Sequence, residues 1–114
     1  MFALLICLAT GIRPIITSSS DEKLDALKAF GSEGSIDTIN YRKFPDWEKE
    51  VLRLTNGRGV DVVIENGGPS TADKSLASIS RRGVVSLVGF LGGFNVEAQP
   101  NLLLPTLQKT ARIQ

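Results

Sequence analysis

Histidine is absent from this sequence of 114 residues, and cysteine occurs only once. The lack of histidine excludes Ser-His-Asp and Cys-His catalysis by the chain alone, and it removes the commonest zinc ligand. The single Cys7 cannot form an internal disulfide, and its place in an apolar run favours a small buried side chain. We therefore expect no catalytic residue and no metal site within this chain.

An excess of charge of either sign is also missing, because 13 Lys and Arg against 12 Asp and Glu leave a net charge of +1. Without a basic field, nucleic acid is not an expected partner. The apolar run at residues 1–9 is far shorter than the roughly 18–20 residues of a membrane span, so no membrane partner is expected.

The same apolar run lacks the preceding Lys or Arg of a secretion signal. An internal buried helix that ends at Gly11 is the preferred interpretation, and a signal peptide is the alternative. The expected location is cytoplasmic, with a mitochondrial location left open.

Two short apolar runs are the strongest structural signals. Val60–Glu65 is rich in β-branched residues and ends in Asn66-Gly67-Gly68-Pro69, whereas Val84–Val88 ends in Gly89. Such runs, closed by turn residues, are typical of strands buried on both faces of a parallel sheet. Ligands of these sheets bind at the carboxyl ends of the strands, so Glu65 to Gly68 is where a site is expected.

Weaker patterns alternate between strand and helix before Val60. Ile15–Thr17 predicts a short buried strand, and Ser19 with Glu22 has capping-box spacing for a helix that ends at Gly31. A second strand is predicted over Ile36–Tyr41. A helix follows, and its apolar stripe is formed by Trp47, Val51 and Leu54.

After the apolar run Val60–Glu65, Ser70 with Asp73 again has capping-box spacing and predicts a helix, which Arg81-Arg82-Gly83 would end. Beyond the apolar run Val84–Val88, Pro105 interrupts the apolar segment Leu102–Leu104, and only a short tail is expected after it. The alternation predicts an α/β fold with a doubly wound parallel sheet.

Two stretches in this order, Gly57–Gly68 and Arg82–Phe90, resemble the nucleotide-binding domain of the medium-chain dehydrogenase/reductase superfamily. The likeness is greatest to its zinc-type alcohol dehydrogenase-like and quinone oxidoreductase-like members. Three further stretches match the same pattern: Ile16–Leu24, Thr38–Arg42 and Lys109–Gln114.

The resemblance implies a partial Rossmann-type dinucleotide-binding domain over residues 1–114. In that family, a first strand and a glycine-rich turn precede the helix that Met1–Thr10 would form, and neither is in this sequence. The family's substrate domain, with its zinc ligands where present, is also missing. Ala111–Gln114 would begin a last strand that is cut short, at the place where the family often forms homodimers.

The resemblance further implies a nicotinamide dinucleotide cofactor, with NADP preferred and NAD as the alternative. An acidic residue at the end of the second strand of this fold binds the ribose of NAD, and Thr17–Ser19 offers none. By resemblance, Ser19, Lys23 and Tyr41 would contact the 2′-phosphate of NADP, with Arg42 as a helper.

Two observations weaken that preference. Asp21 and Glu22 place negative charge beside the expected 2′-phosphate site. The three predicted contacts also have ordinary structural explanations, because Ser19 would serve as a helix N-cap, Lys23 as a solvated charge and Tyr41 as a strand residue.

The nicotinamide end of the cofactor is expected where the two apolar strands end. Asn66 offers a donor and an acceptor, and Gly67 would allow a close approach of the backbone to the ligand. Gly89 and Phe90 follow the neighbouring strand and have the same expected role. Glu65 is interpreted as a hydrogen-bonded residue and not as a catalytic acid, because no second carboxylate or histidine lies near it in sequence.

The function implied by these features is that of the cofactor-binding part of an oxidoreductase. The cofactor would carry hydride to or from an alcohol, a carbonyl or an activated alkene. The alternatives are a non-catalytic nucleotide-binding or interaction module and a chain that does not fold stably.

Overall fold

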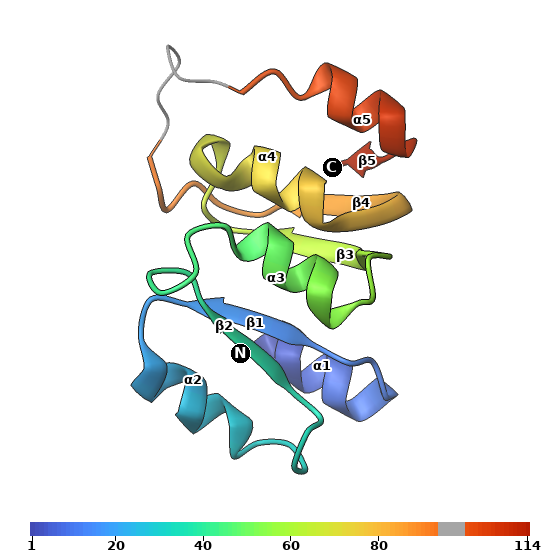
Figure 1. Ribbon diagram of the computed structural model, residues 1–114. Coiled ribbons are helices and arrows are strands. Elements are labelled where there is room, and N and C mark those ends of the chain that lie inside the picture. Colours follow the sequence, from blue (N-terminus) through green and yellow to red (C-terminus); the bar gives the residue numbers. More distant parts are fainter. Residues whose placement is uncertain (94–99) are drawn as a thin grey trace. The chain divides into compact units, whose positions relative to one another are not determined.

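A computed structural model describes residues 1–93 and 100–114. The chain divides into two compact units, Met1–Trp47 and Glu48–Gln114. Each unit contains one parallel sheet flanked by helices (Figure 1). The α/β class and the parallel strands predicted from the sequence are therefore confirmed, although the strands form two separate sheets.

The first unit contains one pair of parallel strands. In chain order its elements are α1 (Phe2–Thr10), β1 (Ile15–Ser18), α2 (Asp21–Lys28) and β2 (Asp37–Asn40). Residues 15–18 of β1 pair with residues 37–40 of β2, so the carboxyl ends of both strands lie side by side. Leu24 of α2 and Ile39 of β2 are both 3% exposed and form part of the core of this unit.

Helix α1 forms as predicted and ends at Gly11, whose φ of 75° is readily adopted only by glycine. The prediction that this helix is buried was wrong, because Leu4 is its one buried residue. Phe2 is 78% exposed, and Cys7 is only partly buried. The apolar run therefore formed a helix without the packing that its composition suggested.

Strand β1 is less buried than expected, since Thr17 is exposed and the other three residues are partly so. Helix α2 is shorter than expected and is capped by a different serine. Ser20, and not Ser19, is the N-cap, and its hydroxyl accepts a hydrogen bond from the Lys23 N–H at 3.4 Å. The helix ends at Lys28 and not at Gly31. Three successive serines offer equivalent caps, so the spacing to Glu22 did not identify the right one.

The second unit begins within α3 (Trp47–Leu54). This helix starts and ends at the first and last residues of the predicted apolar stripe. The elements that follow are β3 (Val60–Glu65), α4 (Pro69–Ser78), β4 (Ile79–Leu87), α5 (Leu103–Lys109) and β5 (Arg112–Ile113). The strands lie in the order β3-β4-β5, all parallel. The core of this unit comprises Leu76, Ile79 and Val85, each 1% exposed.

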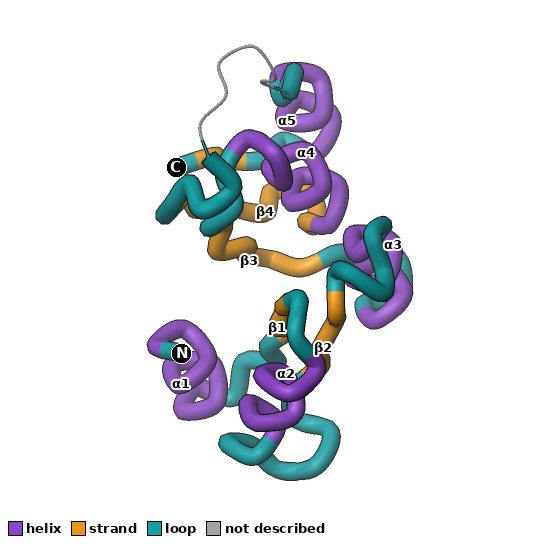
Figure 2. Tube along the Cα trace, turned by 90° about the vertical axis from the view of Figure 1, so that its left-hand side faces the viewer, coloured by secondary structure: helices purple, strands orange, loops and turns teal. Residues whose placement is uncertain are grey.

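Strand β3 has the predicted bounds, but it is not buried on both faces. Alternate residues of a strand point to opposite sides. Val63 packs against the core of the unit, whereas Val62 and Ile64 are 56% and 49% exposed. Helices α3 and α4 lie on the same side of β3 in Figure 2, which leaves the other face of the strand uncovered within this unit.

Helix α4 differs from the prediction at both ends. It begins at Pro69, which has a fixed φ that suits the first helical position, and no side chain caps it. The Ser70–Asp73 capping box is therefore absent. At the other end, Arg81 and Arg82 lie in β4 and not in the helix. A register shift opposite β3 accommodates them, with Arg82 in the left-handed region at φ 62°.

The segment after residue 100 also holds more structure than expected. Pro105 lies in the first turn of α5, where a backbone N–H is not needed for the helix, so it does not interrupt it. The Lys109 ammonium donates to the carbonyls of Ala77 and Ile79, at 2.7 and 2.6 Å, and burial lowers the pKa of this lysine. The last strand predicted over Ala111–Gln114 is present as β5, and it pairs with β4.

Candidate functional site

The loops that follow β3 and β4 meet at the carboxyl edge of the sheet in the second unit. The Val88 N–H donates to the Glu65 carbonyl at 2.9 Å, and the Leu91 N–H donates to the Asn66 carbonyl at 2.8 Å. The Gly92 N–H likewise donates to the Gly67 carbonyl at 3.0 Å. Backbone pairing thus continues past the ends of both strands and joins the two loops.

This joint brings together the four residues that the sequence placed at the nicotinamide end. A side chain at Gly89 would lie 3.5 Å from both the carbonyl and the amide oxygen of Asn66. The Phe90 ring lies directly over Gly68, the neighbour of Gly67. Phe90 is 52% exposed, so its ring also forms part of the surface at this edge. Their proximity is a fact of the structure, whereas their role toward a cofactor stays a prediction.

Glu65 holds the turn between β3 and α4. Its Oε1 accepts hydrogen bonds from the N–H groups of Gly67 and Gly68, at 2.6 and 3.2 Å, and from the Thr71 hydroxyl at 2.7 Å. Its Oε2 accepts a hydrogen bond from the Ser75 hydroxyl. The side chain is 5% exposed. The prediction of a hydrogen-bonded residue at the strand end is confirmed, and this carboxylate ties the strand, the turn and the helix together.

The glycines of the joint are required by the packing of the protein itself. A side chain at Gly67 would collide with Thr71 and approach Glu65 Oε1 to 3.1 Å. Gly68 has a φ of 85°, and a side chain there would lie 2.8 Å from the Phe90 ring. A side chain at Gly92 would lie 2.8 Å from the Gly67 carbonyl. These contacts explain the glycines without a ligand, so the close approach of a cofactor to Gly67 remains untested.

A second group of predicted residues lies at the carboxyl edge of β1 and β2 in the first unit. Ser18 pairs with Asn40, and the Tyr41 N–H donates to the Ser18 carbonyl at 3.1 Å. Ser19 follows β1 directly, and Lys23 lies in the first turn of α2. Lys23 is exposed, and Tyr41 is 43% exposed. The edge thus carries all three residues that were assigned to the 2′-phosphate.

Asp21 at the same edge is paired, which the sequence reasoning missed. The Lys43 ammonium lies 2.5 Å from its Oδ2, and the Asn40 amide donates to its Oδ1 at 2.7 Å. The Asn40 amide oxygen in turn accepts from the Arg42 N–H at 3.0 Å. The hydrogen bonds from Lys43 and then Asn40 hold the pKa of Asp21 below its ordinary value. The adjacency of parallel strand ends was the signal that could have identified Lys43.

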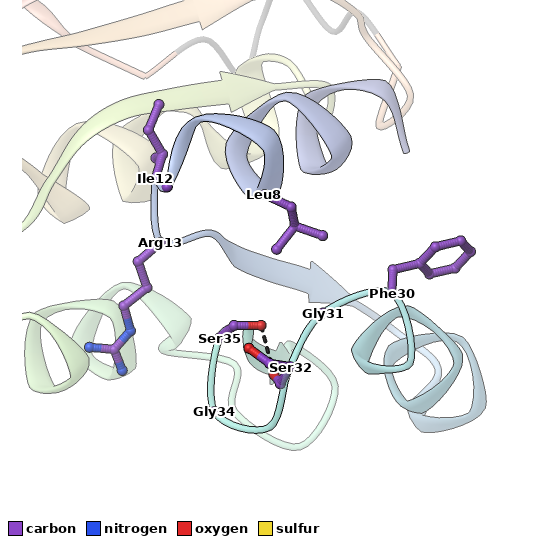
Figure 3. Close-up of a pocket in the computed structure, with 9 residues that line it drawn as sticks. Leu8, Ile12, Arg13, Phe30, Gly31, Ser32, Gly34 and Ser35 are labelled. Carbon is purple, nitrogen blue, oxygen red and sulfur yellow. Dashed lines mark hydrogen bonds between the residues drawn. The ribbon is translucent and has the colours of Figure 1, made fainter.

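A hollow of about 480 Å³ opens elsewhere in the first unit (Figure 3). It is lined by the end of α1, by Arg13 and by the loop from Phe30 to Ser35. Arg13 pairs with Asp37 at 2.7 Å at the amino end of the strands. None of the predicted site residues lines this hollow, which lies at the opposite edge of the sheet from Tyr41.

Residues 1–93 and 100–114 offer neither a metal site nor a membrane-spanning helix. No group of three or more His, Cys, Asp or Glu residues in these segments could hold a metal ion. None of the helices in the same segments has the length and apolar character needed to cross a bilayer.

Comparison with known proteins identifies the family. The model of the zinc-binding dehydrogenase family matches residues 1–112. A zinc-type alcohol dehydrogenase-like protein of Schizosaccharomyces pombe is 44% identical over 90 residues, which are 79% of this chain and 25% of that protein.

Two solved structures have the same fold. One is the quinone oxidoreductase of Escherichia coli complexed with NADPH, with a TM-score of 0.81 and 25% identity over 98% of this chain and 32% of that one. The other is an NAD-dependent alcohol dehydrogenase, with a TM-score of 0.80 and 31% identity over 97% of this chain and 30% of that one. The chain therefore spans only a quarter to a third of these relatives. It belongs to the zinc-binding dehydrogenase family, and it corresponds to the nucleotide-binding domain of the medium-chain dehydrogenase/reductase superfamily.

Proposed function

We propose that this chain is the cofactor-binding part of a nicotinamide-dinucleotide-dependent oxidoreductase. The observation that carries the proposal is the joint between the β3 and β4 loops, which places Asn66, Gly67, Gly89 and Phe90 together at the carboxyl edge of a parallel sheet. The solved relatives with NADPH and with NAD dependence support the same cofactor class.

Each unit, taken by itself, offers residues suited to one end of a dinucleotide. Asn66 would supply an amide donor and acceptor to the nicotinamide end, and the exposed Phe90 ring would supply an apolar surface beside it. Ser19, Lys23 and Tyr41 would hold the adenosine end. No G-x-G-x-x-G motif occurs in the sequence, so we assign no residue to the pyrophosphate.

The adenosine end favours NADP over NAD. Lys23 is exposed next to the end of β1, where it can pair with a 2′-phosphate. Of the two carboxylates that would oppose this phosphate, Asp21 and Glu22, Asp21 is already bound to Lys43 and Asn40. NAD stays the rival cofactor, because an NAD-dependent relative matches the fold equally well.

When bound, the cofactor would supply hydride for the reaction of an alcohol, a carbonyl or an activated alkene. The residues of this chain would bind and orient it, and none of them is assigned as a catalytic acid or base. The substrate domain, a homodimeric assembly and a cytoplasmic location belong to the same proposal for the whole protein.

Calorimetric titration of the 114-residue chain tests the cofactor assignment. We expect NADPH and 2′,5′-ADP to bind more tightly than NADH and 5′-ADP. Lys23→Ala should weaken 2′,5′-ADP by about tenfold, the value of one charge-assisted hydrogen bond. Lys28→Ala is the matched control, because Lys28 lies at the other end of α2 and pairs with Asp25 at 3.4 Å.

A second variant separates the two ends of the cofactor. Asn66→Ala should weaken NADPH and leave 2′,5′-ADP unchanged, since Asn66 lies at the nicotinamide end in this proposal. A folded chain, shown by a cooperative urea transition, that binds none of the four nucleotides would overturn the proposed function.

A further inference from the structure

We propose that Lys43 sets the cofactor preference of this chain by neutralising Asp21, and that it does so without touching the cofactor. The inference rests on the proposed function and assigns a role to two residues that the cofactor contacts above do not use. Its starting point is the pairing of Asp21 with Lys43 and Asn40 at the edge where the 2′-phosphate would bind.

The position of Asp21 makes its charge matter. It is the first residue of α2, directly after the N-cap Ser20 and two residues before Lys23. A carboxylate there would repel a 2′-phosphate and would accept a hydrogen bond from a ribose 2′-hydroxyl. A free Asp21 would therefore favour NAD.

The structure shows both carboxylate oxygens of Asp21 engaged. Lys43, in the turn after β2, contacts Oδ2, and Asn40, the last residue of that strand, donates to Oδ1. Asn40 is 8% exposed and also binds the Arg42 N–H, so it holds the turn that carries Lys43. The buried Asn40 side chain therefore helps to position the Asp21–Lys43 pair, although Lys43 itself is exposed.

Charge counting gives the direction of each change. Lys23, Arg42 and Lys43 against Asp21 and Glu22 leave this edge with a net charge of +1. Lys43→Gln lowers the net charge to zero and frees Asp21, whereas Asp21→Asn raises it to +2. The first change should disfavour a 2′-phosphate, and the second should favour it.

The test is a double-mutant cycle read as the ratio of the dissociation constants of 5′-ADP and 2′,5′-ADP, measured by calorimetry on the full chain. Lys43→Gln should lower this ratio roughly two- to fivefold, the range for an exposed ion pair. In the Asp21→Asn background the same substitution should lower the ratio by a clearly smaller factor, because the net charge of the edge still falls, from +2 to +1, but no carboxylate is freed. A general loss of structure would weaken both nucleotides alike and leave the ratio unchanged.

Two further measurements sharpen the test. At about 1 M salt the effect of Lys43→Gln should shrink, because charges are screened within about 3 Å. The control pair Asp25→Asn and Lys28→Gln, at the far end of the same helix, should not alter the ratio.

Three results would overturn the inference, and they are distinguishable. An unchanged ratio in Lys43→Gln excludes a role for Lys43. An equal effect in the Asp21→Asn background shows that Lys43 acts on the phosphate directly and not through Asp21. A folded wild-type chain that binds neither nucleotide overturns the proposed function, and this inference with it.

Discussion

Replacing Glu65 by alanine should destabilise the second unit more than any surface substitution. The change removes the acceptor of four hydrogen bonds, from the N–H groups of Gly67 and Gly68 and the hydroxyls of Thr71 and Ser75. The donors of Gly68 and Ser75 are buried and would find no water in the unchanged structure. Each buried donor left without a partner costs about 1–3 kcal/mol.

Two such donors, with the cavity left by the side chain, give an expected loss of about 3–5 kcal/mol. Glu65 is 5% exposed, so solvent screening does not reduce this figure much. Domains of this size are stable by about 5–15 kcal/mol, so the variant would lose a large part of its stability. Glu65→Gln should cost less, about 1–2 kcal/mol, because one oxygen still accepts and the Ser75 hydroxyl can turn to accept from the amide.

Urea unfolding followed by circular dichroism measures these differences, with the midpoint and the slope fitted for each variant. Glu50→Ala is the matched control, because Glu50 pairs with Arg53 on the surface of α3 and should cost at most about 1 kcal/mol. The reasoning is refuted if Glu65→Ala lies within 1 kcal/mol of Glu50→Ala, or if Glu65→Gln is as damaging as Glu65→Ala.

Two further predictions concern backbone strain and pH. Gly68→Ala should cost about 2–3 kcal/mol, because strain at its φ of 85° adds to a clash with Phe90, whereas Gly57→Ala, at φ 82° with open space around it, should cost about 1 kcal/mol; thermal unfolding compares the two. The hydrogen bond from Arg58 holds the pKa of Asp61 below its ordinary value, so the stabilisation is present above about pH 4 and is lost as the pH falls through the lowered pKa. The effect should be small, since both side chains are exposed. In Asp61→Asn the urea midpoint should depend less on pH between about pH 5 and 2 than in the unmodified chain.

Much of the fold was predictable because its strands are short apolar runs closed by turn residues. β3 has the predicted bounds, and the strand-end position of Glu65 correctly indicated a hydrogen-bonded carboxylate. The starts of two helices were predicted poorly. The N-cap of α2 is Ser20 and not Ser19, and α4 begins at Pro69 without the predicted cap at Ser70. Local spacing cannot rank several capping residues that lie side by side.

The sequence by itself determined the order of strands and helices as far as Val88, because periodicity and turn residues are local properties of the chain. It also indicated the family, through the motifs at Gly57–Gly68 and Arg82–Phe90. Only the tertiary structure decided how those residues are used. It left Val62 and Ile64 exposed, because burial depends on which helices cover a strand. It also paired Asp21 with Lys43 across 22 positions of sequence, which compensates one of the two carboxylates, Asp21 and Glu22, that argued against NADP. An ion pair of that kind depends on two strand ends meeting in space, which no local pattern encodes.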